Sequence, residues 1–534
     1  MPGKNILIRT TFISFLILLV SLLVSPAQAK SILWGNLEPG PYGVGFKTIE
    51  KYDYSRTLRA GADYLGTPIS GENARPILIG LWYPAVWPDD ALELVYGEYV
   101  FPFPHDSTFY NFLAQLQQGE FGVLNYLAGG IAGADREALN IDMAAGRDIP
   151  HAEGRFPLLI YFPHARSGYY DNLIMCEYLA SHGFVVVSTP SLAQALGNLP
   201  PDDAYLETQV QDKAFAMANI RDLDFVDMNK LAVFGAGLGA SEAILLRMRN
   251  YDIKAVACLG GTRTPLDYAE MARRNHFFNL QRMNVPLLYV HHGEGIPADL
   301  SLIDSCIYAE RYVAALSDTA HTSFSIYDAM VEIMQDTLGI LTNISRPNYE
   351  TGCRYLHEFF KACLNEDSSA MAFMTGASPN NDIDPGFASV QIMQAQDQPP
   401  TPDQFIAVIR NHGAQTAEEI YREFNNKQPG SIVLQEAVIN ILGYQALQTG
   451  NAQDAVILFR LNTEVYPNSS NVWDSYADGL AALGENDKVI ECYKRVLEVL
   501  PTDTVTNAQL KETLRINAEQ GLERLQNPQN ENNQ

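Results

Sequence analysis

Residues 231–241 read Leu-Ala-Val-Phe-Gly-Ala-Gly-Leu-Gly-Ala-Ser, and this stretch decides the fold. Its first four residues are apolar throughout, as a strand covered on both faces of a sheet must be. Glycines at 235, 237 and 239 follow at once, and a helical pattern then runs over Gly239–Asn250. A buried strand, a tight turn and a helix in direct succession are typical of a parallel sheet with crossover helices.

Further apolar runs of strand type lie on both sides of this stretch, separated by helical patterns such as Asn172–His182. The runs are 76–84, 156–163, 184–189, 254–259 and 286–291. This alternation predicts a doubly wound, mostly parallel α/β sheet. Residues 85–150 interrupt it with an aromatic-containing insertion, for which a lid and a decorative loop region are equally good interpretations.

The N-terminus has the pattern of a secretory signal. Lys4 and Arg9 are its cations, Thr11–Val24 is its apolar stretch, and Ala27-Gln28-Ala29 forms a small-residue cleavage site. The apolar stretch is shorter than the roughly 20 residues of a membrane span. We therefore expect a signal peptide at 1–29 and a protein exported to the periplasm or secreted. An uncleaved membrane anchor is the alternative.

Length and charge limit the class of protein. A chain of 534 residues is too long for one hydrophobic core, so two or more domains are expected. A net charge of −26 repels phosphates, which argues against nucleic acid as a partner. The six cysteines are scattered and lack metal-ligand spacing, so we expect most of them to be buried apolar residues.

The C-terminal part of the chain has an internal period. Ser, Asn, Gly and Pro enrich residues 366–403, which we interpret as a linker after a first domain at 30–365. Beyond it, Ala455, Phe459 and Pro467 recur 34 residues later as Val489, Tyr493 and Pro501, and Ala417, Tyr421 and Pro429 form a degenerate earlier copy. This period predicts an all-α tetratricopeptide-repeat domain at 404–526, which would bind a protein or peptide, before a disordered tail at 527–534. An unrelated helical bundle is the alternative.

The glycine-rich turn is where chemistry is expected. In α/β-hydrolases the nucleophile lies on a sharp strand-to-helix turn of the pattern Gly-x-Ser-x-Gly. Residues 235–239 have the flanking glycines of that pattern, but Gly237 stands at the nucleophile position. A glycine has no side chain with which to attack a substrate.

Residues from about 40 to 365 resemble the platelet-activating-factor acetylhydrolase and dienelactone-hydrolase branch of the α/β-hydrolases, most closely bacterial exported members with tetratricopeptide repeats behind the hydrolase domain. The matching stretches are Gly40–Gly45, Phe156–Tyr161, Cys176–Val186 and Phe225–Leu231.

The resemblance implies positions for the rest of the catalytic triad. The acid position falls on Gly260, where Leu259-Gly260-Gly261 replaces Leu-Asp-Gly, and Glu294 or Asp299 is the alternative acid. His321 is the retained base candidate, but it has no general-base task without a hydroxyl to deprotonate. The turn at 163–168 and the start of the following helix imply Ala165, Arg166 and Leu238 as oxyanion candidates.

The sequence gives little support for a replacement nucleophile or a metal ion at this site. Ser241 lies about one helical turn, roughly 6 Å, beyond Gly237, which places it badly as a nucleophile, and Ser167 on the oxyanion turn is nearer. His291, His292 and His321 lack the carboxylates of a usual metal site. We therefore expect neither metal nor cofactor.

These observations predict an exported, hydrolase-derived protein that is non-catalytic and serves as a ligand-binding or protein-interaction scaffold. Its old pocket would hold an acyl or glycan ligand, and its repeats a protein partner. The alternative is an active esterase- or lipase-like serine hydrolase with an unrecognised nucleophile.

Overall fold

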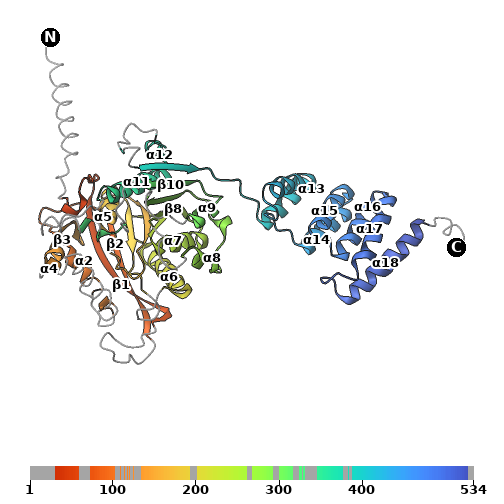
Figure 1. Ribbon diagram of the computed structural model, residues 1–534, viewed down its shortest axis with the longest axis horizontal. Helices are drawn as coiled ribbons and strands as arrows, with labels where there is room; N and C mark the ends of the chain where they lie inside the picture. Colours follow the sequence, from red (N-terminus) through yellow and green to blue (C-terminus); the bar gives the residue numbers. More distant parts are fainter. Residues whose placement is uncertain are drawn as a thin grey trace, which may run out of the picture. The chain divides into compact units, whose positions relative to one another are not determined.

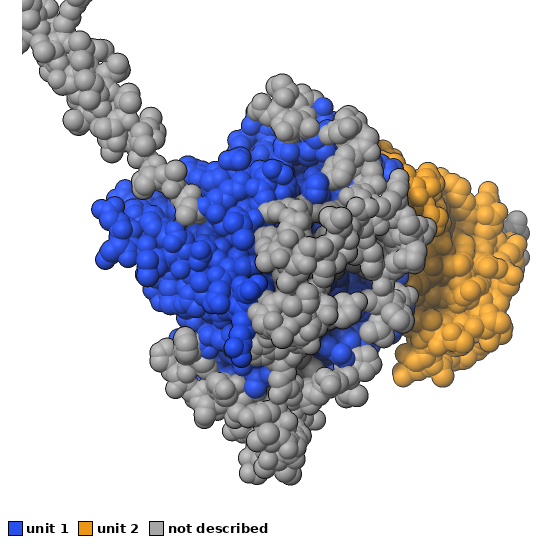
Figure 2. Space-filling view, turned by 60° about the vertical axis from the view of Figure 1, so that its left-hand side comes forward, with its two compact units in different colours: residues 1–396 blue, residues 397–534 orange. Residues whose placement is uncertain are grey.

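The computed structural model describes residues 30–526 apart from 59–72, most of 103–133, 193–200, 261–267, 293–299, 317–323, 328, 331–345 and most of 377–387. The chain forms two compact units, 1–396 and 397–534 (Figures 1 and 2). The predicted signal peptide and C-terminal tail lie outside the described residues. Within the described part of the chain, no helix has the length and apolar character needed to cross a bilayer.

The first unit is built on one sheet, in which the described strands have the order β11-β10-β9-β8-β7-β5-β6-β2-β1-β4-β3. The strands are β1 (Gly43–Leu58), β2 (Asn73–Ala85), β3 (Glu93–Val95), β4 (Asp142–Arg147), β5 (Phe156–Phe162), β6 (Val185–Ser188), β7 (Val226–Ala236), β8 (Ile253–Leu259), β9 (Leu287–His292), β10 (Arg311–Leu316) and β11 (Ala388–Met393). The helices are η1 (Ile32–Trp34), α2 (Tyr96–Val100), α4 (Ala134–Leu139), α5 (Leu173–Ser181), α6 (Asp203–Ile220), α7 (Leu238–Arg249), α8 (Tyr268–Arg274), η2 (Leu280–Arg282), α9 (Ser301–Ser305), α11 (Arg346–Asn365) and α12 (Ser368–Met374).

The centre of the sheet is parallel. Strands β6, β5, β7, β8, β9 and β10 pair in parallel, while β2 joins β6 antiparallel and β1 joins β2 antiparallel. The predicted mostly parallel α/β sheet, followed by a helical region, is confirmed. The swap of β5 and β6 in the strand order, with a tight turn after β7, gives the first unit an α/β-hydrolase-like fold.

Helices cover both faces of the sheet (Figure 1). Along β5, Leu158, Ile160 and Phe162 point into one hydrophobic cluster with α6, α7 and α8, whereas Leu159 and Tyr161 point into a second with α5 and α11. Because successive side chains of a strand face opposite sides, burial on both sides requires an unbroken apolar run. That requirement explains why the sequence of β5 contains no charged residue.

The structure corrects the predicted linker at 366–403. Asp367 caps α12 by accepting hydrogen bonds from the amides of Ser369 and Ala370, and β11 pairs antiparallel with β10 at the edge of the sheet. The first unit therefore continues to Gln396. Helix caps and linkers share Ser, Asp and Asn, so composition alone did not distinguish them.

The predicted insertion at 85–150 also contributes to the sheet. Its described residues include β4, which pairs in parallel with β1, and β3, which pairs antiparallel with β4. These strands extend the sheet at one edge. Most of 103–133, where a lid would have to lie, is outside the described residues.

The second unit consists of helices in the described part of the chain. They are α13 (Pro402–Lys427), α14 (Glu436–Gln448), α15 (Ala452–Val465), α16 (Ser470–Ala482), α17 (Asn486–Val499) and α18 (Ala508–Gln526). Both α16 and α17 begin 34 residues after α14 and α15, respectively. A Cβ at Gly443 of α14 would lie 2.4 Å from the ring of Phe459 of α15, so a small residue is required where α14 and α15 meet. The tetratricopeptide assignment itself stays a prediction.

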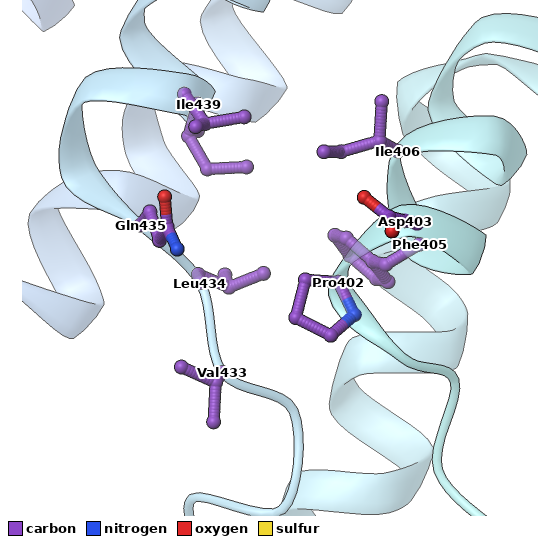
Figure 3. Close-up of a pocket in the computed structure, with 9 residues that line it drawn as sticks. Pro402, Asp403, Phe405, Ile406, Val433, Leu434, Gln435 and Ile439 are labelled. Atoms are coloured by element: carbon purple, nitrogen blue, oxygen red, sulfur yellow. The ribbon is translucent and has the colours of Figure 1, made fainter. Parts of the chain in front are cut away.

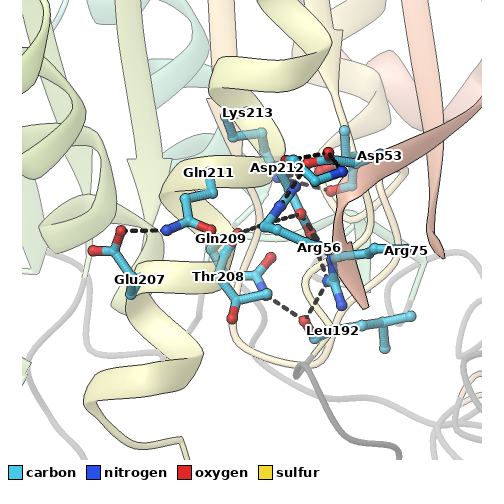
Figure 4. Close-up of polar contacts among 12 residues, drawn as sticks. Asp53, Arg56, Arg75, Leu192, Glu207, Thr208, Gln209, Gln211, Asp212 and Lys213 are labelled. Carbon is cyan, nitrogen blue, oxygen red and sulfur yellow. Dashed lines mark hydrogen bonds and ion pairs between the residues drawn. The ribbon is translucent and has the colours of Figure 1, made fainter. Parts of the chain in front are cut away.

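A buried ion cluster joins the β1–β2 hairpin to α6 (Figure 4). Arg75 is 1% exposed, and its guanidinium holds both carboxylate oxygens of Asp212, with Nε–Oδ1 at 2.8 Å and Nη2–Oδ2 at 2.6 Å. Arg56 adds a contact of 2.8 Å to Asp212 and one of 2.6 Å to Asp53. A bidentate geometry of this kind compensates for much of the desolvation of the charges.

Replacing Asp212 by alanine leaves two guanidinium groups without their shared carboxylate. We expect Asp212→Ala to lower the free energy of unfolding by about 3–5 kcal/mol, because an unpaired buried charge remains. Asp203, which lies on α6 like Asp212, pairs with Arg274 of α8, but both side chains are about half exposed. Asp203→Ala should therefore lower the free energy of unfolding by less than about 1 kcal/mol. Urea unfolding measures both. Equal effects would contradict the structural role assigned to Asp212.

Candidate functional site

Gly237 stands at the apex of the turn between β7 and α7. Its backbone has φ 59° and ψ −122°, a conformation that residues with a side chain rarely adopt. Its amide donates a hydrogen bond to the carbonyl oxygen of Leu259 at 3.2 Å, which ties the turn to the end of β8. The strained apex expected of a nucleophile turn is therefore present, but without a nucleophile.

The flanking glycines are required by close backbone approach. A Cβ at Gly235 would lie 2.0 Å from the carbonyl oxygen of Gly239, and a Cβ at Gly239 would lie 2.4 Å from that of Phe162. Real Cβ atoms do not approach backbone so closely. These two positions therefore hold the first turn of α7 directly against the ends of β5 and β7.

An imidazole fills the space beside the apex. A Cβ built on Gly237 would lie 2.9 Å from Cδ2 of His164 and 3.6 Å from its Nε2. The ring is oriented by Asp171, whose Oδ2 lies 2.6 Å from His164 Nδ1 and also accepts from the His164 amide at 3.1 Å. Asp171 is 2% exposed and accepts a further hydrogen bond from the hydroxyl of Tyr161. A carboxylate that orients a histidine next to a nucleophile position is the arrangement of a catalytic base.

Sequence analysis missed this pair because the resemblance assigned the base to His321. His164 directly follows Pro163 at the end of β5, and Asp171 comes seven residues later across a turn, a spacing with no periodic signature. The available signal was that both residues follow the strand that neighbours β7.

Gly260, the expected acid position, directly follows β8, which pairs with the strand that leads to Gly237, β7. Its backbone has φ 53°, and its amide donates to the carbonyl oxygen of Val290 at 2.7 Å. A Cβ there would lie 3.0 Å from the ring of Phe324. The structure thus brings the two glycines to adjacent strand ends, and both positions lack functional side chains.

One of the three residues expected to supply an oxyanion donor, Arg166, already uses its amide in another hydrogen bond. The amide of Arg166 donates to the hydroxyl of Tyr205 at 2.7 Å, so Arg166 is not available as an oxyanion donor through its amide. Tyr205 in turn donates to the carbonyl oxygen of Ser191, which anchors the turn. No described residue accepts a hydrogen bond from the amide of Ala165 or Leu238. These two amides therefore stay candidates for the predicted oxyanion donors.

The two serines considered as substitute nucleophiles lie in different surroundings. Ser241 is buried, and its hydroxyl donates to the carbonyl oxygen of Tyr268 at 3.4 Å. The amide of Ser167 donates to the carbonyl oxygen of His164, and the carbonyl oxygen of Ser167 accepts from the amide of Ser191. His321, Glu294 and Asp299 lie outside the described residues.

The cysteines and possible metal ligands were also located. All six cysteines are unpaired, and five are buried, as expected; Cys363 is half-buried. His291 stacks on Tyr289 with ring centroids 5.3 Å apart. Within the described part of the chain, no three His, Cys, Asp or Glu residues gather in a group that could hold a metal ion.

Two ionisable side chains, one on α6 and one on α7, are completely buried in the first unit. Glu242 on α7 is fully buried, and neither carboxyl oxygen has a hydrogen-bond partner, so burial raises its pKa to about 8. Lys213 on α6 is also fully buried, and burial lowers its pKa to about 8, while its amine donates to the carbonyl and hydroxyl oxygens of Thr189. Attraction to Lys213 limits the rise at Glu242.

Replacing Glu242 by glutamine removes the carboxyl but keeps its size. Because the pKa of Glu242 is higher in the folded chain than its ordinary 4.5, its contribution to stability is complete below pH 4.5 and is lost as the pH rises toward 8. We therefore expect the stability of Glu242→Gln relative to the unmodified protein to increase between these pH values and to level off above them. Urea unfolding across this range measures the difference, with the exposed Glu153→Gln as control. Parallel pH profiles would contradict the burial of a protonated carboxyl.

Comparison with known proteins gives little further information. No protein-family model and no curated protein matches the sequence. Among solved structures, the chain is similar to a ferulic acid esterase from Streptomyces cinnamoneus, with 17% identity and a TM-score of 0.43 over 66% of this chain and 97% of that one. A likeness this distant carries no functional argument, so the account of the site rests on its geometry.

Proposed function

We propose that the first unit is a hydrolase-derived binding domain that forms no covalent intermediate with its ligand, and that the second unit binds a protein or peptide partner. The observation that carries this proposal is Gly237 at the apex of the turn, with the His164 ring beside it. Loss of a triad nucleophile lowers turnover by about a millionfold. Binding does not need that side chain.

The ligand would be an acyl compound or a glycan. The amides of Ala165 and Leu238 supply donors for a carbonyl or hydroxyl oxygen, and His164, held by Asp171, supplies a group that can donate or accept a proton. The pattern of residues 1–29 supports export to the periplasm or beyond, and the net charge of −26 favours a protein that stays dissolved.

A fluorophosphonate probe tests the absence of a nucleophilic serine. We expect no serine of the unmodified protein to be labelled, as measured by intact mass. Gly237→Ser should be labelled at position 237, because its hydroxyl would lie within reach of the His164 ring. The matched variant Gly237→Ala introduces the same Cβ and the same strained backbone without a hydroxyl, and should stay unlabelled. Labelling of the unmodified protein at Ser167 or any other serine would contradict the proposal.

One observation favours a second function, ester hydrolysis by water. His164 and Asp171 are already in hydrogen-bond contact at 2.6 Å, so the imidazole has the orientation of a general base. In that reaction the ring would take a proton from water as its oxygen attacks the ester carbonyl, and the alcohol would leave with a proton returned by the ring.

Turnover of p-nitrophenyl acetate separates the two functions. The binding proposal predicts release of p-nitrophenol no faster than with heat-inactivated protein. A higher rate that His164→Ala abolishes, with the fold intact by circular dichroism, would establish the hydrolase instead. His321→Ala is the comparison, because it removes the base implied by the resemblance and leaves the His164–Asp171 pair in place.

A further inference from the structure

An apolar pocket lies in the second unit, between the start of α13 and the start of α14 (Figure 3). Its volume is about 160 Å³, and Phe405 and Ile406 face Leu434 and Ile439 across it. Val438 also lines the pocket. Phe405, Leu434 and Ile439 belong to the hydrophobic core of the unit and are almost completely buried. These three residues therefore form a packed part of the pocket wall that is in place before any ligand binds.

The pocket exists because α13 packs chiefly against α15 rather than α14. Gly413, with φ 86° and ψ 168°, breaks α13 into two helical pieces, of which the first carries the pocket residues. The chain segment leading into α14 supplies the opposite wall and includes Val433, a large apolar side chain that is 60% exposed. An apolar cavity with an exposed apolar residue at its mouth is typical of a binding site.

The size of the pocket indicates what enters it. A dry apolar cavity of about 150 Å³ accepts benzene. The pocket between α13 and α14 is of this size, so it matches the phenyl ring of a phenylalanine side chain.

The charge at the mouth indicates the flanking chemistry. Asp403 lines the pocket and is exposed, and it makes no ion pair with a described residue. The amides of the first turn of α13 are not an anion site, because Thr401 and Gln404 cap them in a reciprocal capping box. Acidic residues also outnumber basic ones throughout 397–534. A cationic neighbour is therefore favoured and an anionic one is repelled.

We infer that this pocket binds the phenylalanine side chain of an extended, basic peptide segment of a partner protein, with a lysine or arginine of that segment paired to Asp403. The inference rests on the proposed partner-binding role of the second unit and specifies its recognition chemistry. The ring fills the cavity lined by Ile406 and Val438, and the cation remains at the exposed rim.

Three fluorescein-labelled peptides that differ only at their centre test this inference: Lys-Phe-Lys, Lys-Ala-Lys and Glu-Phe-Glu, each flanked by Gly-Ser on both sides. Fluorescence anisotropy with the full protein measures their dissociation constants. We expect the Lys-Phe-Lys peptide to bind about tenfold or more tightly than the Lys-Ala-Lys peptide, because a phenyl ring leaves water. Of the two peptides that contain phenylalanine, Glu-Phe-Glu should bind more weakly than Lys-Phe-Lys.

Variants assign the binding to the pocket. Ile406→Trp fills the cavity and should reduce Lys-Phe-Lys binding to the level of Lys-Ala-Lys, whereas Ile516→Trp, at a partly exposed isoleucine on α18, should leave it unchanged. Asp403→Lys changes an exposed side chain in the first turn of α13, so circular dichroism is recorded to show that the fold is intact. This substitution should reverse the preference between the Lys-Phe-Lys and Glu-Phe-Glu peptides.

Equal binding of the three peptides, or binding that neither Ile406→Trp nor Asp403→Lys changes, would overturn the inference. A shift from dimer to monomer in sedimentation caused by Ile406→Trp, without peptide preference, would assign the pocket to a second copy of the chain instead. These outcomes concern the second unit alone. The serine-probe result tests the first unit, so the two can fail separately.

Discussion

The first turn of α7 approaches the ends of β5 and β7 so closely that no Cβ fits at Gly235 or Gly239. This approach forces the chain through a left-handed apex at Gly237, the conformation in which a nucleophile would be held. It also brings the end of β5 next to the apex, which is why His164 contacts the empty position. The geometry of this strand-to-helix turn is thus maintained by backbone packing, and it does not depend on a side chain at residue 237.

This separation of geometry from chemistry is what the proposed binding role requires, because the turn keeps its shape without a nucleophile at residue 237. Strained backbone persists only where the surroundings over-determine it, and here those surroundings are the buried strands β5, β7 and β8. The His164–Asp171 pair and the amides of Ala165 and Leu238 are positioned by the same packing. In the proposed binding role they would offer a ligand polar contacts and a proton-transfer group, while covalent catalysis would require an atom that Gly237 does not have.

Much of the sheet was predictable because β5 and the runs 231–236 of β7 and 255–259 of β8 are buried on both faces and therefore apolar. In contrast, β1 mixes polar and apolar residues without a regular alternation, and β11 lies in a stretch with the composition of a linker, so neither had a clear signal. The glycine at the apex was also predictable, from its place between a strand and a helix. The His164–Asp171 pair and the Glu242–Lys213 neighbours were not, since each depends on how separate segments meet in space.

The central claim is that the His164 imidazole lies beside the apex of this turn and that residue 237 supplies no hydroxyl or thiol there. A crystal structure of the protein tests it most directly. The account predicts electron density with the His164 ring against the Cα of Gly237 and Nδ1 in hydrogen-bond contact with Asp171. Density that places a different residue at the apex, with an oxygen or sulfur atom hydrogen-bonded to a histidine, would contradict it.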